Sequence, residues 1–332
     1  MENLNKVMRG QKMKVLTIAI PTYNRVFTLK QALKYVLQQY SEKIEILVSD
    51  NASDDGTEEY MKRICEENKE VIYIRNKKNM GFLKNFQQCA RLAAGKYLLF
   101  LGDDDILLPN KLNDLILTIE RKDDFAFAFL PAASCGEEMF SLGRCTYNLK
   151  EGEIKEYNDI FLFMNSVGFY SSFCSSIILD TEMAKKYWEM PDVANNMFPH
   201  LVVALKAYQE KRKILCFEED IVAARTSDHS YSIFKTLFKD WKEVIYKYGV
   251  EAGIPYKRRK EVFQDTLADF MNELIYTYRI GEMPFKENYL YLWKNLLFNF
   301  KLLKKCFFVL ILPLDILRLL DIKFNRKYRA SS

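Results

Sequence analysis

The sequence is poor in glycine and histidine, with 12 glycines and two histidines in 332 residues. No two glycines are spaced Gly-x-Gly, and no GxxxxGKS or GxxxxGKT loop occurs. These absences exclude the dinucleotide-binding fingerprint and the P-loop, which are the common glycine-based phosphate sites. The phosphates of any bound nucleotide must therefore be neutralised in another way, and a metal ion held by carboxylates is one.

The seven cysteines are odd in number and scattered, and no two are spaced CxxC. This pattern argues against a disulfide framework and against structural zinc, so we expect reduced thiols in a reducing compartment. The N-terminal segment "MENLNKVMRGQKMK" lacks the apolar region of a signal peptide. We therefore expect a protein that stays inside the cell.

Charge is distributed unevenly along the chain, whose net charge is +5. Residues 283–332 contain ten Lys or Arg and three Asp or Glu, a net charge of +7, which leaves about −2 for the rest. An anionic partner is therefore expected at the C-terminal tail.

Between residues 14 and 105, short apolar runs alternate with amphipathic helical stretches. Leu29, Leu33, Val36 and Leu37 share one helical face, and Phe82, Phe86, Ala90 and Ala93 share another. The runs are rich in β-branched and aromatic residues, which favours strands at 15–20, 44–48, 71–75 and 97–101. Such alternation predicts an α/β fold with a mostly parallel sheet that is covered on both faces.

Later parts of the chain are less regular. Residues 123–130 and 175–180 are predicted as two further strands, whereas 131–169 has no assignable pattern. From Tyr231 onward the pattern predicts helices only.

Three polar segments fall at the ends of predicted strands: "IPTYNR" (20–25), "SDNASDDGT" (49–57) and "GDDD" (102–105). Ligands of parallel sheets bind at the carboxyl ends of the strands. Taken alone, the three aspartates are consistent with a solvated turn, in which one of them caps a helix starting near Pro109. They are equally consistent with a site for a divalent metal.

The segments "TIAIPTYNR", "ILVSDNASDDGT" and "NKKNMGFLKNFQQCARLAAGKYLLFLGDDD" resemble, in this order and spacing, the family-2 glycosyltransferases. These are nucleotide-sugar enzymes with the GT-A fold. The resemblance is close over residues 14–105 and loose to about residue 230. It implies an N-terminal extension (1–13), a GT-A domain (14–230) and a helical C-terminal region (231–332).

The resemblance also implies how the donor binds. Asp50 would face the base, since a carboxylate accepts the imide N–H of uracil or thymine, unless it only caps its turn. Lys84 is either a phosphate contact or a solvated lysine. The full set of residues implied for the nucleotide-sugar is Pro21, Thr22, Tyr23, Asn24, Arg25, Asp50, Asn51, Asn79, Gly81, Lys84 and Asp103.

The aspartate segment departs from the family's DxD motif, because Gly102 stands where the first aspartate is usual. The resemblance makes Asp104 the ligand of Mg²⁺ or Mn²⁺ and Asp103 the replacement for the missing carboxylate. Asp105 would orient the neighbouring loop. Hard cations accept one or two carboxylates together with phosphate oxygens.

An inverting transfer needs a base that takes the proton of the acceptor hydroxyl. Residues 191–210 resemble the helix that carries this base, but the usual acidic pair is absent. His200 is our candidate and Asp192 its competitor, although a histidine at a helix start can simply bond the backbone.

A loop at residues 224–232 resembles the one that closes over the diphosphate in this family. There His229 would reach the metal or a phosphate, with Arg225 or Ser230 assisting. An ordinary surface loop remains the alternative.

The basic tail carries an apolar stripe, formed by Leu290, Trp293, Leu297 and Phe300 on one predicted helical face. Lysines mark another face, and the apolar run 306–314 is far shorter than the ~20 residues that span a bilayer. The tail is therefore either a core-packing helix or one that lies on an anionic membrane.

Together these observations predict an inverting, metal-dependent hexosyl- or N-acetylhexosaminyltransferase that uses a nucleotide-sugar, with UDP-sugar favoured. The expected acceptor is a surface polysaccharide, a lipopolysaccharide or a lipid-linked glycan, met at the cytoplasmic face of the cell membrane, and no nucleic acid is expected. A sugar nucleotidyltransferase is an alternative, but it should carry a Gly-rich loop where this chain has "PTYNR". A non-catalytic nucleotide-sugar-binding module is the other, motivated by Gly102 and by the missing acidic base.

Overall fold

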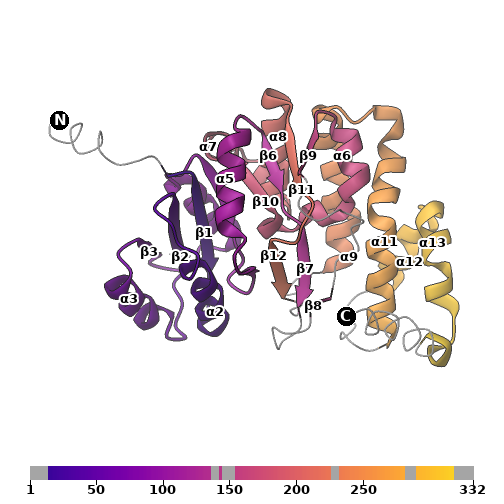
Figure 1. Cartoon of the computed structure of the whole chain (residues 1–332). Helices are drawn as coiled ribbons and strands as arrows, with labels where there is room; N and C mark the ends of the chain where they lie inside the picture. Colours follow the sequence, from indigo (N-terminus) through magenta and orange to yellow (C-terminus); the bar gives the residue numbers. More distant parts are fainter. Residues whose placement is uncertain (1–13, 136–141, 144–153, 226–231, 281–288, 318–332) are drawn as a thin grey trace. The chain divides into compact units, whose positions relative to one another are not determined.

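The computed structural model describes residues 14–135, 142–143, 154–225, 232–280 and 289–317, and these form two compact units (Figure 1). The first unit holds the described residues up to 159 and from 171 to 225. The second holds 160–170 and the described residues from 232 onward. Residues 160–170, which we had placed in the domain 14–230, thus group with the helical region.

The first unit alternates strands and helices along the chain. Its first half contains β1 (Leu16–Thr22), α2 (Val26–Leu37), β2 (Ile44–Asp50), α3 (Thr57–Glu67), β3 (Val71–Arg75), α4 (Phe82–Leu92), β4 (Tyr97–Phe100), β5 (Ile106–Leu107), α5 (Leu112–Lys122) and β6 (Phe127–Phe129). Its second half contains β7 (Ala132–Cys135), β8 (Leu142–Gly143), β9 (Ile154–Tyr157), β10 (Ile177–Asp180), α7 (Thr181–Trp188), α8 (Pro199–Lys211), β11 (Ile214–Phe217) and β12 (Val222–Arg225).

The main sheet has eight strands in the order β3-β2-β1-β4-β10-β6-β11-β9. Strands β3, β2, β1 and β4 are parallel, whereas β10 runs antiparallel between β4 and β6. Every residue of β1, β2 and β4 is buried, which explains why these strands appear in the sequence as near-continuous apolar runs. A smaller sheet has the order β5-β12-β7-β8.

The two faces of the main sheet are covered by different helices. Leu99 belongs to the core that includes the buried residues of α2, α3 and α5. Its neighbour Phe100 points to the other face, where its ring lies 4.9 Å from Phe86 of α4 and 4.9 Å from Trp188 of α7. This alternation along β4 confirms the predicted sheet with helices on both faces.

Three details of the prediction for this unit were wrong. Phe82 does not belong to the buried face of α4; it is 45% exposed, and Asn85 is buried instead. The helix expected near Pro109 begins at Leu112, and no aspartate caps it, since its N-cap is Lys111. The strand expected at 123–130 is limited to Phe127–Phe129.

The second unit is helical throughout its described residues, as predicted. It contains α6 (Ile160–Val167), α9 (Ile233–Lys235), the π-helical segments η4 (Thr236–Trp241) and η5 (Val244–Gly249), α10 (Val250–Ala252), α11 (Arg259–Ile280), α12 (Tyr289–Leu297) and α13 (Phe300–Ile311). None of the described helices is long and apolar enough to cross a membrane.

Helix α13 packs beside α11 (Figure 1). Lys301 forms an ion pair with Asp265, and Arg279 Nη1 donates to the Val309 carbonyl at 2.6 Å. The helix is interrupted between α12 and α13, where Asn299 is the N-cap of α13. The apolar stripe predicted on one helix from Leu290 to Phe300 is therefore divided between two helices.

Candidate active site

The carboxyl ends of β1, β2 and β3 lie level with one another. Thr22 pairs with Asp50 across β1 and β2, and Asp50 pairs with Arg75 across β2 and β3. Strand β4 is in register with β1 at Phe100, just before Gly102. The polar segments 20–25, 49–57 and 102–105 therefore meet at one sheet edge, as the sequence predicted.

The aspartate cluster (Asp103, Asp104 and Asp105) follows β4 at this edge. Thr22 Oγ1 donates to Asp103 Oδ2 at 2.7 Å. Arg25 Nη1 lies 3.2 Å from Asp103 Oδ1 and 2.7 Å from Asp104 Oδ2. The side chain of Asp103 is 8% exposed and that of Asp104 is 15% exposed. Asp104 is thus the member of this pair that is more open to a ligand.

Asp105 is buried and fixes the position of the loop. Ser175 Oγ donates to Asp105 Oδ2 at 2.6 Å, and the Arg225 backbone N–H donates to Asp105 Oδ1 at 3.3 Å. Ser175 Oγ also accepts from the Gly102 N–H at 2.9 Å. Asp105 therefore connects the cluster to β12 and to the start of β10, in a positioning role.

Gly102 has its residue type for a steric reason. A Cβ atom at this position would lie 2.4 Å from Asp105 Oδ2 and 3.1 Å from Asp104 Oδ1. The first distance is far below van der Waals contact, so no side chain fits while Asp105 keeps its place. An aspartate in place of Gly102 would therefore require the Asp105 carboxylate to move.

Burial raises the pKa of two of the three aspartates. Burial raises the pKa of Asp103 to about 6, although the Arg25 charge and the Thr22 hydroxyl act in the opposite direction. Burial, with the neighbouring charge of Asp104 added, raises the pKa of Asp105 to about 7. Each acid therefore needs a cation or a proton near neutral pH.

The fit of a metal ion depends on the donor set. Among the described residues, no three or more His, Cys, Asp or Glu side chains are grouped so as to hold a metal. Asp103 and Asp104 do present carboxylate oxygens to a shared cation, the guanidinium of Arg25. The residues fit Mg²⁺ or Mn²⁺ that shares its coordination with a diphosphate, a set in which hard cations bind. His229 and Ser230 lie outside the described residues.

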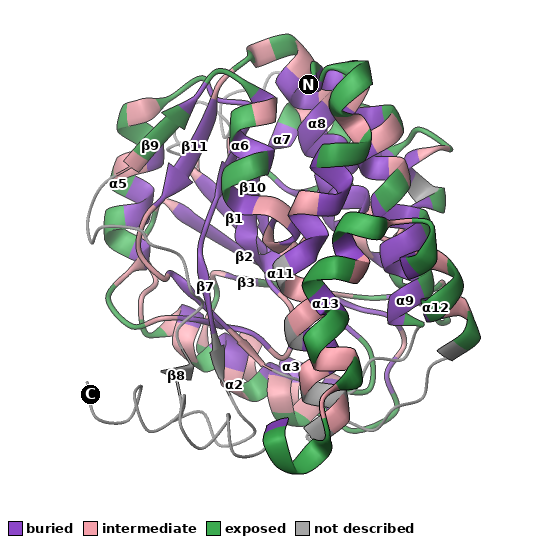
Figure 2. Ribbon diagram, turned by 90° about the vertical axis from the view of Figure 1, so that its right-hand side faces the viewer, coloured by how far each residue is buried: buried purple, intermediate pink, exposed green. Residues whose placement is uncertain are grey.

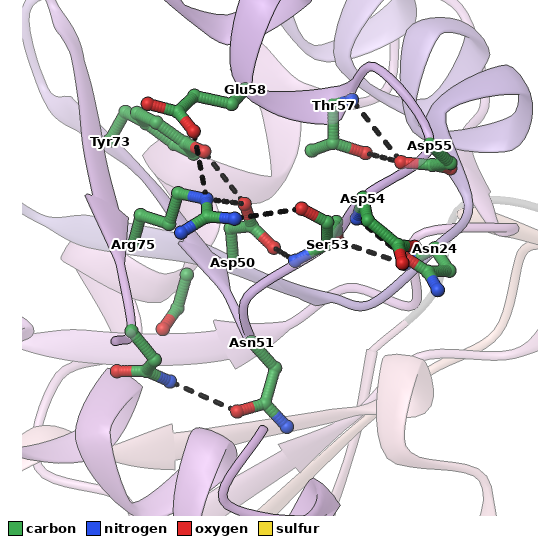
Figure 3. Close-up of polar contacts among 12 residues, drawn as sticks. Asn24, Asp50, Asn51, Ser53, Asp54, Asp55, Thr57, Glu58, Tyr73 and Arg75 are labelled. Atoms are coloured by element: carbon green, nitrogen blue, oxygen red, sulfur yellow. Dashed lines mark hydrogen bonds and ion pairs between the residues drawn. The ribbon is translucent and has the colours of Figure 1, made fainter. Parts of the chain in front are cut away.

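Asp50 forms the centre of a second polar group, the Asp50 cluster (Asp50, Ser53, Glu58, Tyr73 and Arg75), shown in Figure 3. The carboxylate accepts from the Ser53 N–H at 2.8 Å and from the Tyr73 hydroxyl at 2.7 Å, and Arg75 Nε lies 3.4 Å away. Arg75 Nε also lies 3.1 Å from Glu58 Oε2. Asp50 is fully buried, so this cluster fixes it rigidly. A contact from Asp50 to a base stays a prediction.

The loops after β1 and β2 are joined by Asn24, which has a positive φ of 52°. Its backbone N–H donates to Ser53 Oγ at 2.9 Å, and its Oδ1 accepts from the Asp54 N–H at 2.8 Å. Asparagine tolerates this left-handed conformation better than most residues. The bonds hold "PTYNR" against "SDNASDDGT", and they leave the ring of Tyr23 44% exposed beside them.

The start of α4 is fixed by asparagine side chains. Asn51 Nδ2 donates to Asn79 Oδ1 at 2.7 Å, and Asn51 Oδ1 accepts from the Met80 N–H at 2.9 Å. Asn79 Oδ1 also accepts from the N–H of Gly81, whose φ is +84°. The amide-rich loop thus presents the N-terminus of α4 toward the same edge, with Lys84 exposed on its first turn.

The predicted base candidates belong to the second half of the first unit. His200 follows Pro199 in the first turn of α8, and its Nε2 is buried with no hydrogen-bond partner among the described residues. Burial lowers the pKa of His200 to about 4. Asp192 Oδ2 lies 3.7 Å from Lys206 Nζ, and this carboxylate is half-buried. Helix α8 ends just before β11, which is parallel to β6, so its first turn faces the carboxyl edge of the sheet.

The sequence analysis missed several residues of the site. Tyr73 and Arg75 hold Asp50, and register with Asp50 was the signal that would have found Arg75. Ser175 gave no signal, because its role depends on β10 running antiparallel. Arg25 was expected at the nucleotide-sugar but contacts the aspartates. Arg225 contacts Asp105 through its backbone and Gln31 through its side chain.

Comparisons with known proteins agree with this architecture. The sequence profile of glycosyl transferase family 2 matches residues 17–180, close to half of the chain. Abequosyltransferase RfbV of Salmonella typhimurium is 27% identical over 232 residues, which cover 65% of this chain and 68% of that protein. The GalNAc(5)-diNAcBac-PP-undecaprenol beta-1,3-glucosyltransferase of Campylobacter jejuni is 31% identical over 102 residues, 30% of this chain and 33% of that protein.

Solved structures show the same fold. The crystal structure of TarS 1–349 from S. aureus has a TM-score of 0.57 at 16% identity, and the match covers 88% of this chain and 81% of that one. The same TarS segment in complex with UDP-GlcNAc gives a TM-score of 0.59 and covers 81% and 76%. The GT-A-type fold is thereby confirmed. The chain is a glycosyltransferase and belongs to family 2.

Proposed function

We propose that this chain transfers a sugar from a UDP-sugar to a hydroxyl of a lipid-linked or surface glycan, with inversion and with the help of a divalent metal. The observation that carries this proposal is the meeting of two polar groups at one sheet edge. The Asp50 cluster lies at the end of β2, and the Asp103–Asp104 pair follows β4 on the other side of β1. A nucleoside diphosphate needs both, a base contact and a counter-charge for the phosphates.

UDP is favoured as the nucleotide for two reasons. Asp50 is anchored by Ser53 and Tyr73 and is fully buried, so it would accept the imide N–H of uracil after a shift of Tyr73 or Arg75 uncovers a carboxylate oxygen. Tyr23, which follows β1 at the same sheet edge, is half exposed and can offer its ring to the nucleoside. TarS, which shares the fold, has been crystallised with UDP and with UDP-GlcNAc.

Asp104 would be the main ligand of Mg²⁺ or Mn²⁺, with Asp103 supporting it. When bound, the ion would stabilise the negative charge that develops on the leaving diphosphate. The protein's own contribution is to hold the two carboxylates in place, through Thr22 on Asp103 and through the fixed loop around Asp105. These bonds orient the carboxylates before the donor arrives.

Inversion requires a base on the acceptor side, and the two candidates differ in access. Asp192 is half-buried and ion-paired with Lys206, so an acceptor hydroxyl can approach it. His200 Nε2 is enclosed, so it would serve as a base only after α8 or its neighbours move. We therefore propose Asp192 as the first choice. Comparison of kcat for Asp192→Asn and His200→Gln, with donor hydrolysis measured in parallel, separates the two.

The acceptor is proposed to be presented at a membrane. The name of the Campylobacter relative places its acceptor on undecaprenol. Helices α12 and α13 bury Leu292, Leu296, Leu302 and Cys306, and both helices also expose large apolar side chains. We call these exposed residues together the outer tail face: Leu290, Trp293, Leu297, Phe300, Phe307, Phe308 and Ile311.

Lysines lie between the residues of the outer tail face in α12 and α13, whose exposed segments are green in Figure 2. Lys294 and Lys304 are exposed and form no salt bridge within the described part of the chain. An apolar face bordered by lysines suits an anionic lipid surface, where the rings enter the interface and the ammonium groups meet headgroups. We propose that this face attaches the enzyme to the membrane.

The reaction is tested by incubating the full chain with UDP-, dTDP- and GDP-sugars, with Mn²⁺ or with EDTA. We expect nucleotide release from a UDP-sugar that depends on Mn²⁺ and increases with a polyprenyl-diphosphate glycan acceptor. Release of pyrophosphate from a sugar phosphate and a nucleoside triphosphate would instead identify a nucleotidyltransferase. Binding of UDP-sugar without any turnover, for every acceptor class, would favour a non-catalytic module.

A further inference from the structure

The guanidinium of Arg25 occupies the place where the proposed metal would bind. Its Nη1 atom lies 2.7 Å from Asp104 Oδ2 and 3.2 Å from Asp103 Oδ1. Arg25 is the N-cap residue of α2 and directly follows the "PTYN" loop, and its side chain is 46% exposed. Among the described residues, no other Lys or Arg makes a salt bridge with Asp103 or Asp104.

The two carboxylates need this cation when no donor is bound. They are adjacent in sequence, both contact the same Arg25 nitrogen, and both are largely enclosed. Two negative charges so close together repel strongly where water is excluded. Thr22 supplies a hydrogen bond to Asp103 but no charge. Arg25 thus offsets one of the two negative charges of the pair in the donor-free chain.

A metal ion and the guanidinium compete for Asp104 Oδ2, because both are cations and repel each other when they share one oxygen. Mg²⁺ binds its oxygen ligands at about 2.1 Å, so an ion on Asp104 Oδ2 would place two cations in contact. Arg25 is free to leave because nearly half of its side chain faces solvent. Its planar fork matches phosphate oxygens well, so an arriving diphosphate offers it a better partner.

We propose that Arg25 is a positioning residue that holds the metal's place on Asp103 and Asp104 and moves to the diphosphate when the metal and the donor bind. This inference rests on the metal site of the proposed function. It makes metal and nucleotide bind cooperatively, because the nucleotide removes the cation that competes with the metal. Such coupling acts equally in both directions.

The test measures Mn²⁺ binding directly, by electron paramagnetic resonance of free Mn²⁺ with the full chain, in the absence and presence of UDP. Without UDP, Arg25→Gln should bind Mn²⁺ at least about fivefold more tightly than the wild type, the lower end of typical coupling factors. UDP should then increase Mn²⁺ affinity less in the variant than in the wild type. In saturating Mn²⁺ the variant should also lose affinity for UDP but not for uridine.

Two further variants give the test its controls. Arg75→Gln removes another arginine of the same sheet edge, one that contacts Asp50 and Glu58, and it should leave Mn²⁺ affinity without UDP unchanged. Arg25→Lys keeps a cation but loses the fork, so it should tighten Mn²⁺ binding by less than Arg25→Gln. It also serves if Arg25→Gln does not fold.

If both Arg25 variants bind Mn²⁺ as tightly as the wild type or more weakly, the inference is overturned, because Arg25 then does not compete with the metal. If, in that outcome, the wild type still binds Mn²⁺ when UDP is present, the Arg25 inference fails but the proposed metal site is retained. Absence of Mn²⁺ binding to the wild type with UDP would overturn both the inference and the metal step, and this distinguishes the two failures.

Discussion

Three consecutive aspartates differ in their surroundings, and the differences set their tasks. Asp104 is the most open of the three, Asp103 is held by Thr22 and Arg25, and Asp105 is enclosed with Ser175. A residue type repeated in sequence therefore does not mean a function repeated three times. Each position can be tested separately.

Asp104→Asn should reduce transfer by more than ~10²-fold, because it removes one oriented electrostatic contact to the leaving group. The melting temperature should change little, since Asp104 is the least enclosed member of the cluster. Steady-state turnover and a thermal melt measure the two effects. Asp54→Asn, an exposed aspartate of the neighbouring loop, is the control and should keep near-normal turnover. Near-normal transfer by Asp104→Asn in saturating Mn²⁺ would show that the metal ligand lies elsewhere.

Gly102→Ala should lower stability by about 1–3 kcal/mol, the usual cost of forcing extra volume into a packed site. The added Cβ would meet Asp105 Oδ2 at 2.4 Å. Chemical denaturation followed by fluorescence measures the change. Asp105→Ala should reduce the cost of Gly102→Ala, because it removes the clashing oxygen. Additive losses in the double variant would contradict the steric explanation.

Asp105 should make the protein less stable as the pH rises from about 4 to 7. Its pKa is raised from an ordinary 3.8 to about 7 by burial, so the folded state favours the protonated acid. The stability it contributes is complete below about pH 4 and is lost as the pH passes 7, a change of at most about 4 kcal/mol. Asp103 acts in the same direction up to about pH 6.

Melting curves in EDTA at several pH values test this dependence. In the wild type the melting temperature should fall between pH 4.5 and 8, and in Asp105→Asn, which cannot ionise at this position, it should fall less. Identical pH profiles would mean that Asp105 is ionised throughout.

At the scale of single elements, the sequence predicted best the four parallel strands at the start of the chain. The strand predicted at Val71–Arg75 matches β3 at both ends, and β1, β2 and β4 were found within two residues. The short strands β5, β7, β8, β9, β11 and β12 were missed, because two to four residues carry no periodicity. The direction of β10 has no sequence signal at all, so the role of Ser175 was out of reach.

Helix α4 shows why apolar patterning failed at one position. Asn85 is buried because its Oδ1 accepts from Ser49 Oγ at 2.7 Å and its Nδ2 donates to the Ser49 carbonyl at 2.9 Å. Phe82, which has no such constraint, faces solvent. A buried asparagine whose hydrogen bonds are satisfied cannot be told from an exposed one in the sequence. The predicted buried face of α4 therefore included Phe82 and left out Asn85. The motif loops were found by resemblance, whereas the bonds within them were not.

The outer tail face makes a prediction for α13. Phe300→Ser combined with Phe308→Ser should reduce binding to phosphatidylglycerol vesicles by at least about tenfold, because each buried ring contributes roughly 1.5–3 kcal/mol. Both rings are about 70% exposed in the protein, so folding should be unaffected. Flotation at low and high salt measures the binding. Tyr256→Ser, at a similarly exposed ring outside α12 and α13, should leave binding intact. Unchanged flotation of the double variant would remove the membrane proposal.

At the scale of the whole molecule, the tail both packs and exposes apolar residues. Leu302 and Cys306 are buried while α13 bonds to α11 through Asp265 and Arg279. Truncation after Met283 should therefore lower the melting temperature by more than about 5 °C, because apolar side chains that α12 and α13 now bury would become exposed to water. Differential scanning calorimetry measures the shift. An unchanged melt would show that α13 contributes nothing to stability, and truncation would then be a clean test of membrane binding.

The reversed strand β10 has a consequence for how this enzyme can change its acceptor. Strand β6 ends, and β10 begins, at the edge of the sheet that carries the donor site. The chain from Leu130 to Ser176 thus leaves the sheet and returns to it at that edge. On the way it adds β9 to the main sheet beside β11, β7 and β8 to the smaller sheet, and α6 to the second unit. Replacing the whole segment would therefore remove a strand from the main sheet, and we expect acceptor changes to arise between these elements, where no strand pairing is lost.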